Sequence, residues 1–414
     1  MPNGRTTILQ IIPELDAGGA EQSVAEIVSA LVRARARALV LAEPGGRLRR
    51  SVVAAGGEVL AFPAATKNPL RILANARAIA RLAIREGVHL IHARSRAPAW
   101  SALLAARRAH VPFVTTYHGA YSETNPVKRV YNGVMAKGDI VIANSRYTAE
   151  LIASRYHTQP ERVAVIHRGV DAAIFDPAAI APDRVAALRQ CWGVTDDAPV
   201  ILQAARLTHW KGQSVVIDAV ARLRARGALR DAVLVLAGDA QGRDSYVASL
   251  RSQIEGLGLA SHVRLAGHVQ DMAAAFAAVR VAVIASLEPE AFGRTAVEAA
   301  AVGCPVVATN IGAPPETVLA RPIVPGEART GWLIPPNDVQ ALADALAEAL
   351  ALAPQERAAI GERARRHVLA HFTTEGMQRR TLAVYDGLLG TTLERRFNSS
   401  TPQYNSLTAS RRRP

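Results

Sequence analysis

The sequence predicts an α/β protein of two domains, each built on a parallel β-sheet with helices on its faces. Three observations support this. The chain has 414 residues, more than a single hydrophobic core usually holds. Short runs of branched apolar residues alternate with helical stretches along its whole length. A polar segment that contains several prolines lies near its middle. Strands that alternate with helices form βαβ units, and these make the sheets parallel.

The expected strands fall into two series. Those of the first half cover 7–12, 37–41, 88–92, 113–117, 140–143 and 163–167, and those of the second half cover 200–204, 232–237, 263–266, 281–285, 305–308 and 332–334. Such continuous apolar runs are typical of strands covered on both faces. We therefore expect one domain in residues 1–175, a linker in 176–195 and a second domain in 196–370.

The end of the chain differs from the rest. Residues 354–389 are rich in helix-forming residues, whereas residues 391–414 are polar, aperiodic and basic and close with three consecutive arginines before the last proline. We expect this basic tail to be disordered, because it has too few apolar residues to pay for ordering the chain.

Composition restricts the class of protein. Half of the residues are apolar and 20% are charged, which is typical of a globular chain. Cys191 and Cys304 belong to no metal-binding cluster, so we expect no metal site and a reducing compartment. The chain has no signal-peptide pattern and no run of about 18 apolar residues. We therefore expect a cytoplasmic location.

A net charge of +14 suggests an acidic partner. No helix-turn-helix, zinc-finger or stacked-aromatic signature is visible, so we expect no nucleic acid partner. Peripheral contact with the anionic inner face of the cytoplasmic membrane is the favoured interpretation. The alternative is charge that serves solubility alone.

The most informative segment follows the expected strand 281–285. Glu290 and Glu298 are separated by seven residues across a loop that opens a helix. The free amides of Gly293, Arg294 and Thr295 at this helix start would face an anion. Turns of this kind lie at the carboxyl ends of strands, where open α/β sheets bind ligands. Glu298 could accept the hydroxyl protons of a ribose, and Glu290 would lie nearer an attached sugar.

A second strand end supplies cations. Arg206 and Lys211 follow the expected strand 200–204, and lysine occurs at only four positions in a chain with 49 basic residues. A planar guanidinium and a compact ammonium both suit phosphate oxygens. The alternative is that both are solvated loop charges. Gly18 and Gly19, before the first long helix, could bring backbone amides close to a phosphate or could form a simple tight turn.

These motifs together carry a resemblance. The chain contains Arg-x4-Lys-Gly, then Glu-x-Phe-Gly-x4-Glu, Gly-x-Pro-Val-Val-Ala-Thr and a Gly-Gly-Ala-Glu sequence near its start. Taken together, these motifs and their spacing resemble those of the retaining glycosyltransferase family 4, the group 1 glycosyl transferases of the GT-B fold. The resemblance implies two Rossmann-like domains whose sheets face a central cleft, with a final helix over 371–390 that crosses back to the first domain.

The resemblance also implies roles. Glu290 corresponds to the family's first glutamate, which contacts the transferred sugar, and His118 to a histidine near the C6 side of that sugar. Arg206 and Lys211 complete the implied set of catalytic residues. The implied donor-binding residues are Gly18, Gly19, Arg206, Lys211, Val269, Phe292, Gly293, Arg294, Thr295 and Glu298. No Asp-x-Asp motif is present, so the cations and helix-start amides would replace a metal ion.

The implied activity is the transfer of a hexose from a UDP- or GDP-sugar, with retention and without a metal, to a lipid-linked or polysaccharide acceptor of lipopolysaccharide type. The donor is a substrate, so no cofactor is expected. A sugar-nucleotide epimerase and a non-catalytic sugar-nucleotide-binding protein stay open as alternatives. A phosphorylase is less favoured because it would need a pyridoxal-phosphate lysine, and the second domain offers only Lys211.

Overall fold

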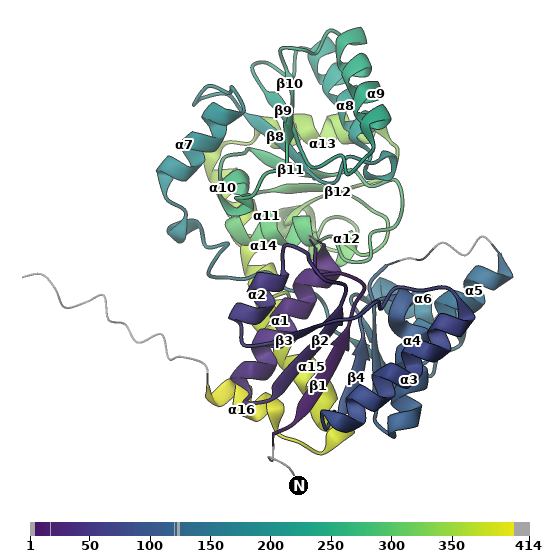
Figure 1. Ribbon diagram of the computed structural model, residues 1–414. Coiled ribbons are helices and arrows are strands. Elements are labelled where there is room, and N and C mark those ends of the chain that lie inside the picture. Colours follow the sequence, from purple (N-terminus) through teal and green to yellow (C-terminus); the bar gives the residue numbers. More distant parts are fainter. Residues whose placement is uncertain (1–4, 17, 120, 122–124, 401–414) are drawn as a thin grey trace, which may run out of the picture.

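Two α/β domains are stacked in the computed structural model, which describes residues 5–16, 18–119, 121 and 125–400. The first contains a seven-stranded sheet in the order β3-β2-β1-β4-β5-β6-β7, and the second a six-stranded sheet in the order β10-β9-β8-β11-β12-β13. Every paired strand within the described residues is parallel. The predicted architecture of two parallel sheets is confirmed (Figure 1).

The strands are β1 (Thr7–Ile11), β2 (Arg37–Ala42), β3 (Glu58–Ala61), β4 (Leu90–Ala93), β5 (Phe113–Tyr117), β6 (Ile140–Ala143), β7 (Val163–Val165), β8 (Val200–Ala204), β9 (Val233–Ala237), β10 (Val263–Gly267), β11 (Val281–Ile284), β12 (Val306–Thr309) and β13 (Gly331–Ile334). The helices are α1 (Gly19–Arg33), α2 (Arg49–Ala54), α3 (Pro69–Arg85), α4 (Arg96–Ala109), α5 (Pro126–Asn132), α6 (Arg146–Tyr156), α7 (Pro182–Cys191), α8 (Gln213–Ala225), α9 (Asp244–Gly256), α10 (Met272–Ala277), α11 (Arg294–Val302), α12 (Pro314–Thr317), α13 (Val339–Ala351), α14 (Pro354–His371), α15 (Thr374–Leu389) and α16 (Leu393–Ser399).

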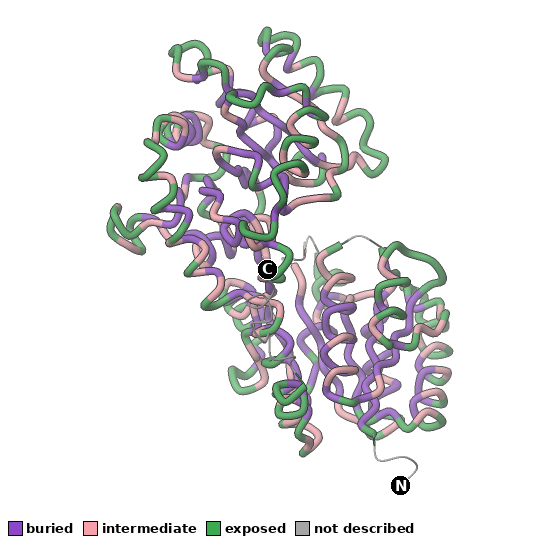
Figure 2. The backbone as a smooth tube through the Cα atoms, turned by 90° about the vertical axis from the view of Figure 1, so that its left-hand side faces the viewer, coloured by how far each residue is buried: buried purple, intermediate pink, exposed green. Residues whose placement is uncertain are grey.

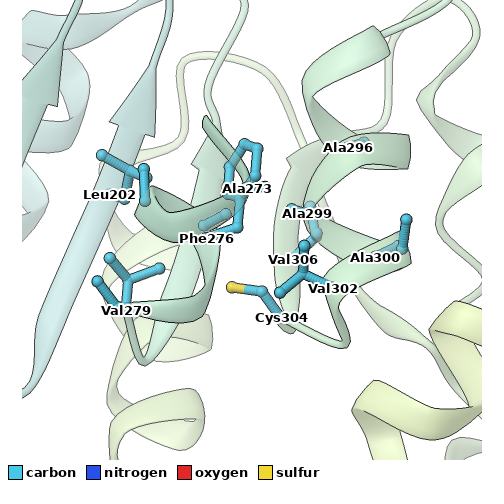
Figure 3. Close-up of a cluster of buried hydrophobic side chains, with 14 of the residues drawn as sticks. Leu202, Ala273, Phe276, Val279, Ala296, Ala299, Ala300, Val302, Cys304 and Val306 are labelled. Atoms are coloured by element: carbon cyan, nitrogen blue, oxygen red, sulfur yellow. The ribbon is translucent and has the colours of Figure 1, made fainter. Parts of the chain in front are cut away.

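Strands in the middle of each sheet, such as β1 and β11, are buried along their whole length, and Figure 2 shows buried residues running through the interior of both domains. In α1, the apolar residues Val24, Ile27, Val28 and Leu31 are at most 1% exposed and pack on one face of the first sheet. In the second domain, α10 and α11 bury small side chains around Phe276 and Cys304 (Figure 3). Burial of this kind explains why the strands appear in the sequence as unbroken apolar runs.

One strand was not predicted. β3 lies at the edge of the first sheet, and none of its four residues is fully buried. An edge strand with an exposed face needs no continuous apolar run, so the pattern that identified the other strands is missing here.

The connection between the domains is folded onto the second one. Trp192 is 4% exposed and belongs to the core of the second domain. Arg184 in α7 donates from two nitrogens to Asp271, at 2.8 Å each. Residues 176–195, expected as a linker, therefore pack against the second domain as a short helical segment.

The end of the chain returns to the first domain. α14 belongs to the second domain, the chain turns at Phe372, and α15 packs against α1 (Figure 1). Tyr385 of α15 is fully buried beneath the first sheet. The predicted helix that crosses back to the first domain is confirmed.

The prediction of disorder from residue 391 was wrong for residues 391–400. Within this stretch, Leu393–Ser399 form α16, whose Leu393 and Phe397 are both 0% exposed. Asp386 accepts hydrogen bonds from the backbone amides of Leu393 at 2.7 Å and Glu394 at 2.9 Å and so caps the helix. One buried pair at i and i+4 anchors the helix although the surrounding sequence is polar. The rest of the expected tail, residues 401–414, lies outside the described residues.

In the described part of the chain, no helix combines the length and the apolar composition needed to cross a lipid bilayer.

Candidate active site

The carboxyl ends of both sheets meet at a hollow between the domains. From the first domain it is lined by Gly19, His118, Asn144 and Arg168; from the second it is lined by Arg206, Lys211, Glu290, Phe292, Gly293, Arg294 and Thr295, among others. These residues follow β1, β5, β6, β7, β8 and β11. Strand ends of the two domains therefore converge on one site, as expected for a ligand held at the edge of open sheets.

Lys211 and Glu290 form an ion pair on the second-domain side. Ser286 donates from Oγ to the same oxygen of Glu290, Oε1, at 2.5 Å. The two charged side chains are only 17% and 12% exposed. Water screens a pair this sheltered less than it screens surface pairs, so each partner strongly fixes the position of the other.

The loop that carries Glu290 is held by the segment that follows β12. The backbone amide of Ala313 donates to the carbonyl of Glu290 at 2.8 Å. Gly312 has φ +82° and lies so close to the backbone of Glu290 that a Cβ atom there would collide with it. Only glycine suits this position.

A second hollow adjoins the first and is lined by Arg206, Gly238, Val269, Thr295 and Glu298, among others. Arg206 and Thr295 line both hollows, so the two form one continuous cleft. Burial raises the pKa of Glu298, although the charge of Arg294 acts in the opposite direction.

Arg294 links this cleft to the first domain. Its Nε donates to Glu298 at 2.9 Å and its Nη2 donates to Glu26 of α1 at 3.1 Å. The guanidinium of Arg294, the first residue of α11, thus joins the second domain to the middle of α1 in the first domain.

On the first-domain side, Arg168 donates from Nη2 to Nδ1 of His118 at 2.6 Å. Burial, followed by the charges of Arg168 and Arg94, lowers the pKa of His118 well below its usual value. Burial and the charge of Arg294 lower the pKa of Arg168 to about 10, which leaves it charged at neutral pH.

The structure brings nearly all of the sequence-predicted site residues to this cleft. Gly18 is the residue before α1 and is not among the lining residues of either hollow, whereas Gly19 lines the first. Phe292 borders the hollow, but its ring packs in the core against Phe372, with centroids 5.9 Å apart. Val269 borders the second hollow and packs against the core. Among the described residues, no three His, Cys, Asp or Glu side chains are grouped as metal ligands.

Two residues that matter here were not among the site residues predicted from the sequence, where Glu316 was interpreted only as a possible loop anchor. Arg168 follows β7, and its position at a strand end was the only available signal. Glu316 of the second domain accepts the backbone amides of Arg146 at 2.9 Å and Tyr147 at 3.0 Å, at the start of α6 in the first domain. It also contacts Nε2 of His167 at 2.7 Å. Glu316 therefore holds the two domains together behind the cleft.

Comparison with known proteins defines the class. The family described as Glycosyl transferases group 1 matches residues 186–367, and the family described as Glycosyltransferase Family 4 matches residues 17–174. Together these two matches cover most of both domains. The chain belongs to the group 1, family 4 glycosyltransferases, which are enzymes of the GT-B fold.

Individual relatives agree with this. The chain is 31% identical over 405 residues to a D-inositol 3-phosphate glycosyltransferase of Kribbella flavida, with 89% of this chain and 91% of that one covered. It is 31% identical over 292 residues, 67% of this chain and 69% of the other, to a GDP-mannose-dependent alpha-(1-6)-phosphatidylinositol monomannoside mannosyltransferase of Mycolicibacterium smegmatis.

Solved structures share the whole fold. A glycosyltransferase from Rickettsia africae superposes with a TM-score of 0.84 at 31% identity and covers 94% of this chain and 100% of its own. The Anabaena protein HepE, solved in complex with UDP-glucose, superposes with a TM-score of 0.79 at 27% identity over 93% of this chain and 100% of its own.

Proposed function

We propose that this glycosyltransferase transfers a hexose from a nucleoside diphosphate sugar, with retention and without a metal ion, to an anionic lipid-linked or polysaccharide acceptor. One observation carries the proposal. Arg206, Lys211 and Glu290 of the second domain share a single hollow with Gly19 and His118 of the first. Such a site can hold a diphosphate and a sugar between the two domains.

The leaving group is the nucleoside diphosphate, and its charge must be stabilised as the bond to the sugar breaks. Arg206 and Lys211 supply two cations for its oxygens. Helix α11 begins directly after Gly293, and the backbone amides of its first turn supply neutral hydrogen-bond donors for the same oxygens. Cations and amides that are already in place need little reorganisation during the reaction.

Glu298 borders the second hollow beside Arg206 and Val269. This hollow is the part of the cleft proposed to bind the nucleoside. The carboxylate of Glu298 would accept the ribose hydroxyls. Glu290 borders the first hollow, the proposed sugar end, where it would accept a hydroxyl of the hexose and orient Lys211.

The names of the relatives support both donor bases. HepE was solved with UDP-glucose, and the mycobacterial relative is named for GDP-mannose. Relatives are also named for inositol phosphate and for phosphatidylinositol mannoside. These are phosphorylated or lipid-linked acceptors, which agrees with an anionic acceptor and does not favour lipopolysaccharide over other such molecules.

A surface on the first domain supports peripheral contact with an anionic membrane on the cytoplasmic side. α3 and α5 lie at the outer edge of this domain (Figure 1). Leu70 and Val127 are 77% and 78% exposed. Stretches 67–85 and 125–133 carry seven basic residues and no acidic one. Each basic side chain near an anionic bilayer contributes about 1 kcal/mol, so this face suits such a surface.

Donor screening tests the proposal. Purified protein is incubated with UDP- and GDP-hexoses in magnesium-free buffer, and released nucleotide and products are measured. We expect nucleotide release with at least one donor, increased by anionic glycolipid acceptors. An altered nucleotide sugar without nucleotide release would instead identify an epimerase. Tight binding of UDP or GDP without any turnover would identify a non-catalytic binding protein.

A further inference from the structure

Arg168 and His118 form a polar pair on the first-domain wall of the cleft. Arg168 lies just beyond β7 and His118 just beyond β5, at the same edge of the sheet. Nη2 of Arg168 lies 2.6 Å from Nδ1 of His118. The other ring nitrogen of His118, Nε2, is buried and has no hydrogen-bond partner among the described residues.

The chemistry of the guanidinium fixes the protonation of the ring. Arginine has five N–H donors and no acceptor, so Nδ1 of His118 must accept the hydrogen bond. A neutral imidazole that accepts at Nδ1 carries its proton on Nε2. A doubly protonated ring would instead bring two cations and two opposed N–H groups together at 2.6 Å.

The groups around His118 strengthen this preference. The charged groups that act on it are Arg168, beyond β7, and Arg94, beyond β4. Arg94 is itself buried and donates to Gln10 and Thr116. His92 of β4 also lies near and is buried, and burial lowers its pKa well below the usual value. Burial and neighbouring cations therefore both oppose a charge on His118.

We propose that Arg168 is a positioning residue that holds His118 as a neutral Nε2–H donor, directed at the sugar of the nucleotide donor. In this arrangement His118 donates a hydrogen bond to a hydroxyl oxygen of the hexose and transfers no proton. The inference deepens the proposed function, since it rests on the first hollow being the sugar site.

A substitution at Gly19 offers an independent way to disturb the contact between Arg168 and His118. A Cβ atom at Gly19 would collide with Nη1 of Arg168 and would meet no other residue closely. Gly19 does not have a left-handed φ, so alanine is compatible with its backbone. Gly19→Ala should therefore push the guanidinium away from His118 without removing its charge.

Nitrogen NMR of ligand-free full-length protein with ¹⁵N-labelled histidine tests the proposal without any substrate. The signal of His118 among the 11 histidines is identified by its loss in His118→Asn. We expect one tautomer, with the proton on Nε2, that persists from neutral pH down to mildly acidic pH. In Arg168→Met and in Gly19→Ala we expect a mixture of tautomers, and in Arg168→Lys we expect the original tautomer because the ammonium still donates.

Several results would overturn it: a proton on Nδ1 in the unmodified protein, a charged His118 at neutral pH, or an unchanged tautomer in Arg168→Met whose other histidine signals show that it is folded. If the tautomer is as expected but no sugar nucleotide alters the His118 signal, the proposed function fails and the role of Arg168 in the free protein stands.

Kinetics provides the second measurement. With an active donor, kcat/KM of the unmodified enzyme should show no titration of His118 in mildly acidic buffer. Arg168→Met should lower kcat/KM by roughly 2- to 10-fold, the effect of weakening one hydrogen bond. Arg168→Lys should recover most of this loss. An acid-side decline in the unmodified enzyme that His118→Asn abolishes would show that His118 becomes charged in this pH range and would contradict the proposal.

Discussion

Breaking the ion pair between Lys211 and Glu290 should affect stability and turnover in different ways. In Lys211→Met, Glu290 loses a partner while it is only 12% exposed. Removing one partner of a fully buried pair costs about 3–5 kcal/mol. Partial exposure and the remaining hydrogen bond from Ser286 reduce this, so we expect a loss of about 2 kcal/mol in the free energy of unfolding. Glu290→Gln should cost a similar amount.

The double variant Lys211→Met/Glu290→Gln measures the energy of the interaction between the two side chains separately from the effect of losing each one. Since Met and Gln together leave no unpaired charge, we expect the double variant to be less destabilised than the sum of the singles by about 1–2 kcal/mol. Urea denaturation followed by tryptophan fluorescence measures this, because Trp192, Trp210 and Trp332 all lie in the second domain. Turnover should behave differently: Lys211→Met should lower kcat by about 10²- to 10³-fold, and the double variant should recover none of it. Additive losses of stability, or a kcat within tenfold of the unmodified enzyme in Lys211→Met, would refute this reasoning.

Three further changes test contacts that stabilise the fold. Glu316→Ala removes a charged cap from α6, so we expect about 2 kcal/mol of destabilisation and faster hydrogen exchange at the first turn of α6; unchanged exchange there would contradict the assigned contact. Burial alone would raise the pKa of Glu316, but the hydrogen bonds from His167 and from the two α6 amides outweigh it and lower the pKa. Its stabilising contribution is therefore present above about pH 4.3 and is lost as the pH falls through the lowered value, and Glu316→Gln should flatten this part of the pH–stability curve. Phe397→Ala should detach α16, at a cost of up to about 3–5 kcal/mol, and expose its amides to exchange; full protection of α16 would contradict its anchoring role.

The sequence identified those parts of the fold whose pattern follows directly from burial. Parallel strands covered on both faces require unbroken apolar runs, and these were visible. The edge strand β3 and the helix α16 could not be recognised in this way. The first is half exposed, and the second depends on a single pair, Leu393 and Phe397, that becomes meaningful only against α1 and α15.

The site shows the same limit. Arg206, Lys211, Glu290 and Glu298 could be found because each follows a strand at the ligand-binding edge of a sheet. Arg168 acts on a histidine 50 residues away, and its importance depends on a contact of 2.6 Å. Glu316 contacts residues of the other domain. Contacts between distant segments leave no local pattern in a single sequence.

Besides Glu316, two sets of contacts link the domains and hold the two halves of the site in position relative to each other. Arg294 pairs with Glu26 across the interface. Val170 exchanges backbone hydrogen bonds with Phe372 and Thr374, where the chain crosses between the domains in both directions. Closure of the cleft on a donor would have to preserve or rearrange these contacts, which makes them suitable positions for probes of domain motion.

Turnover of the active nucleotide sugar in excess chelator is the most direct test of the proposal that Arg206, Lys211 and the amides at the start of α11 stabilise the departing diphosphate. The account predicts that kcat is unchanged by the chelator and falls by about 10²-fold or more when Arg206 is replaced by methionine. Loss of activity in chelator that added magnesium restores, with little effect of Arg206→Met, would contradict it.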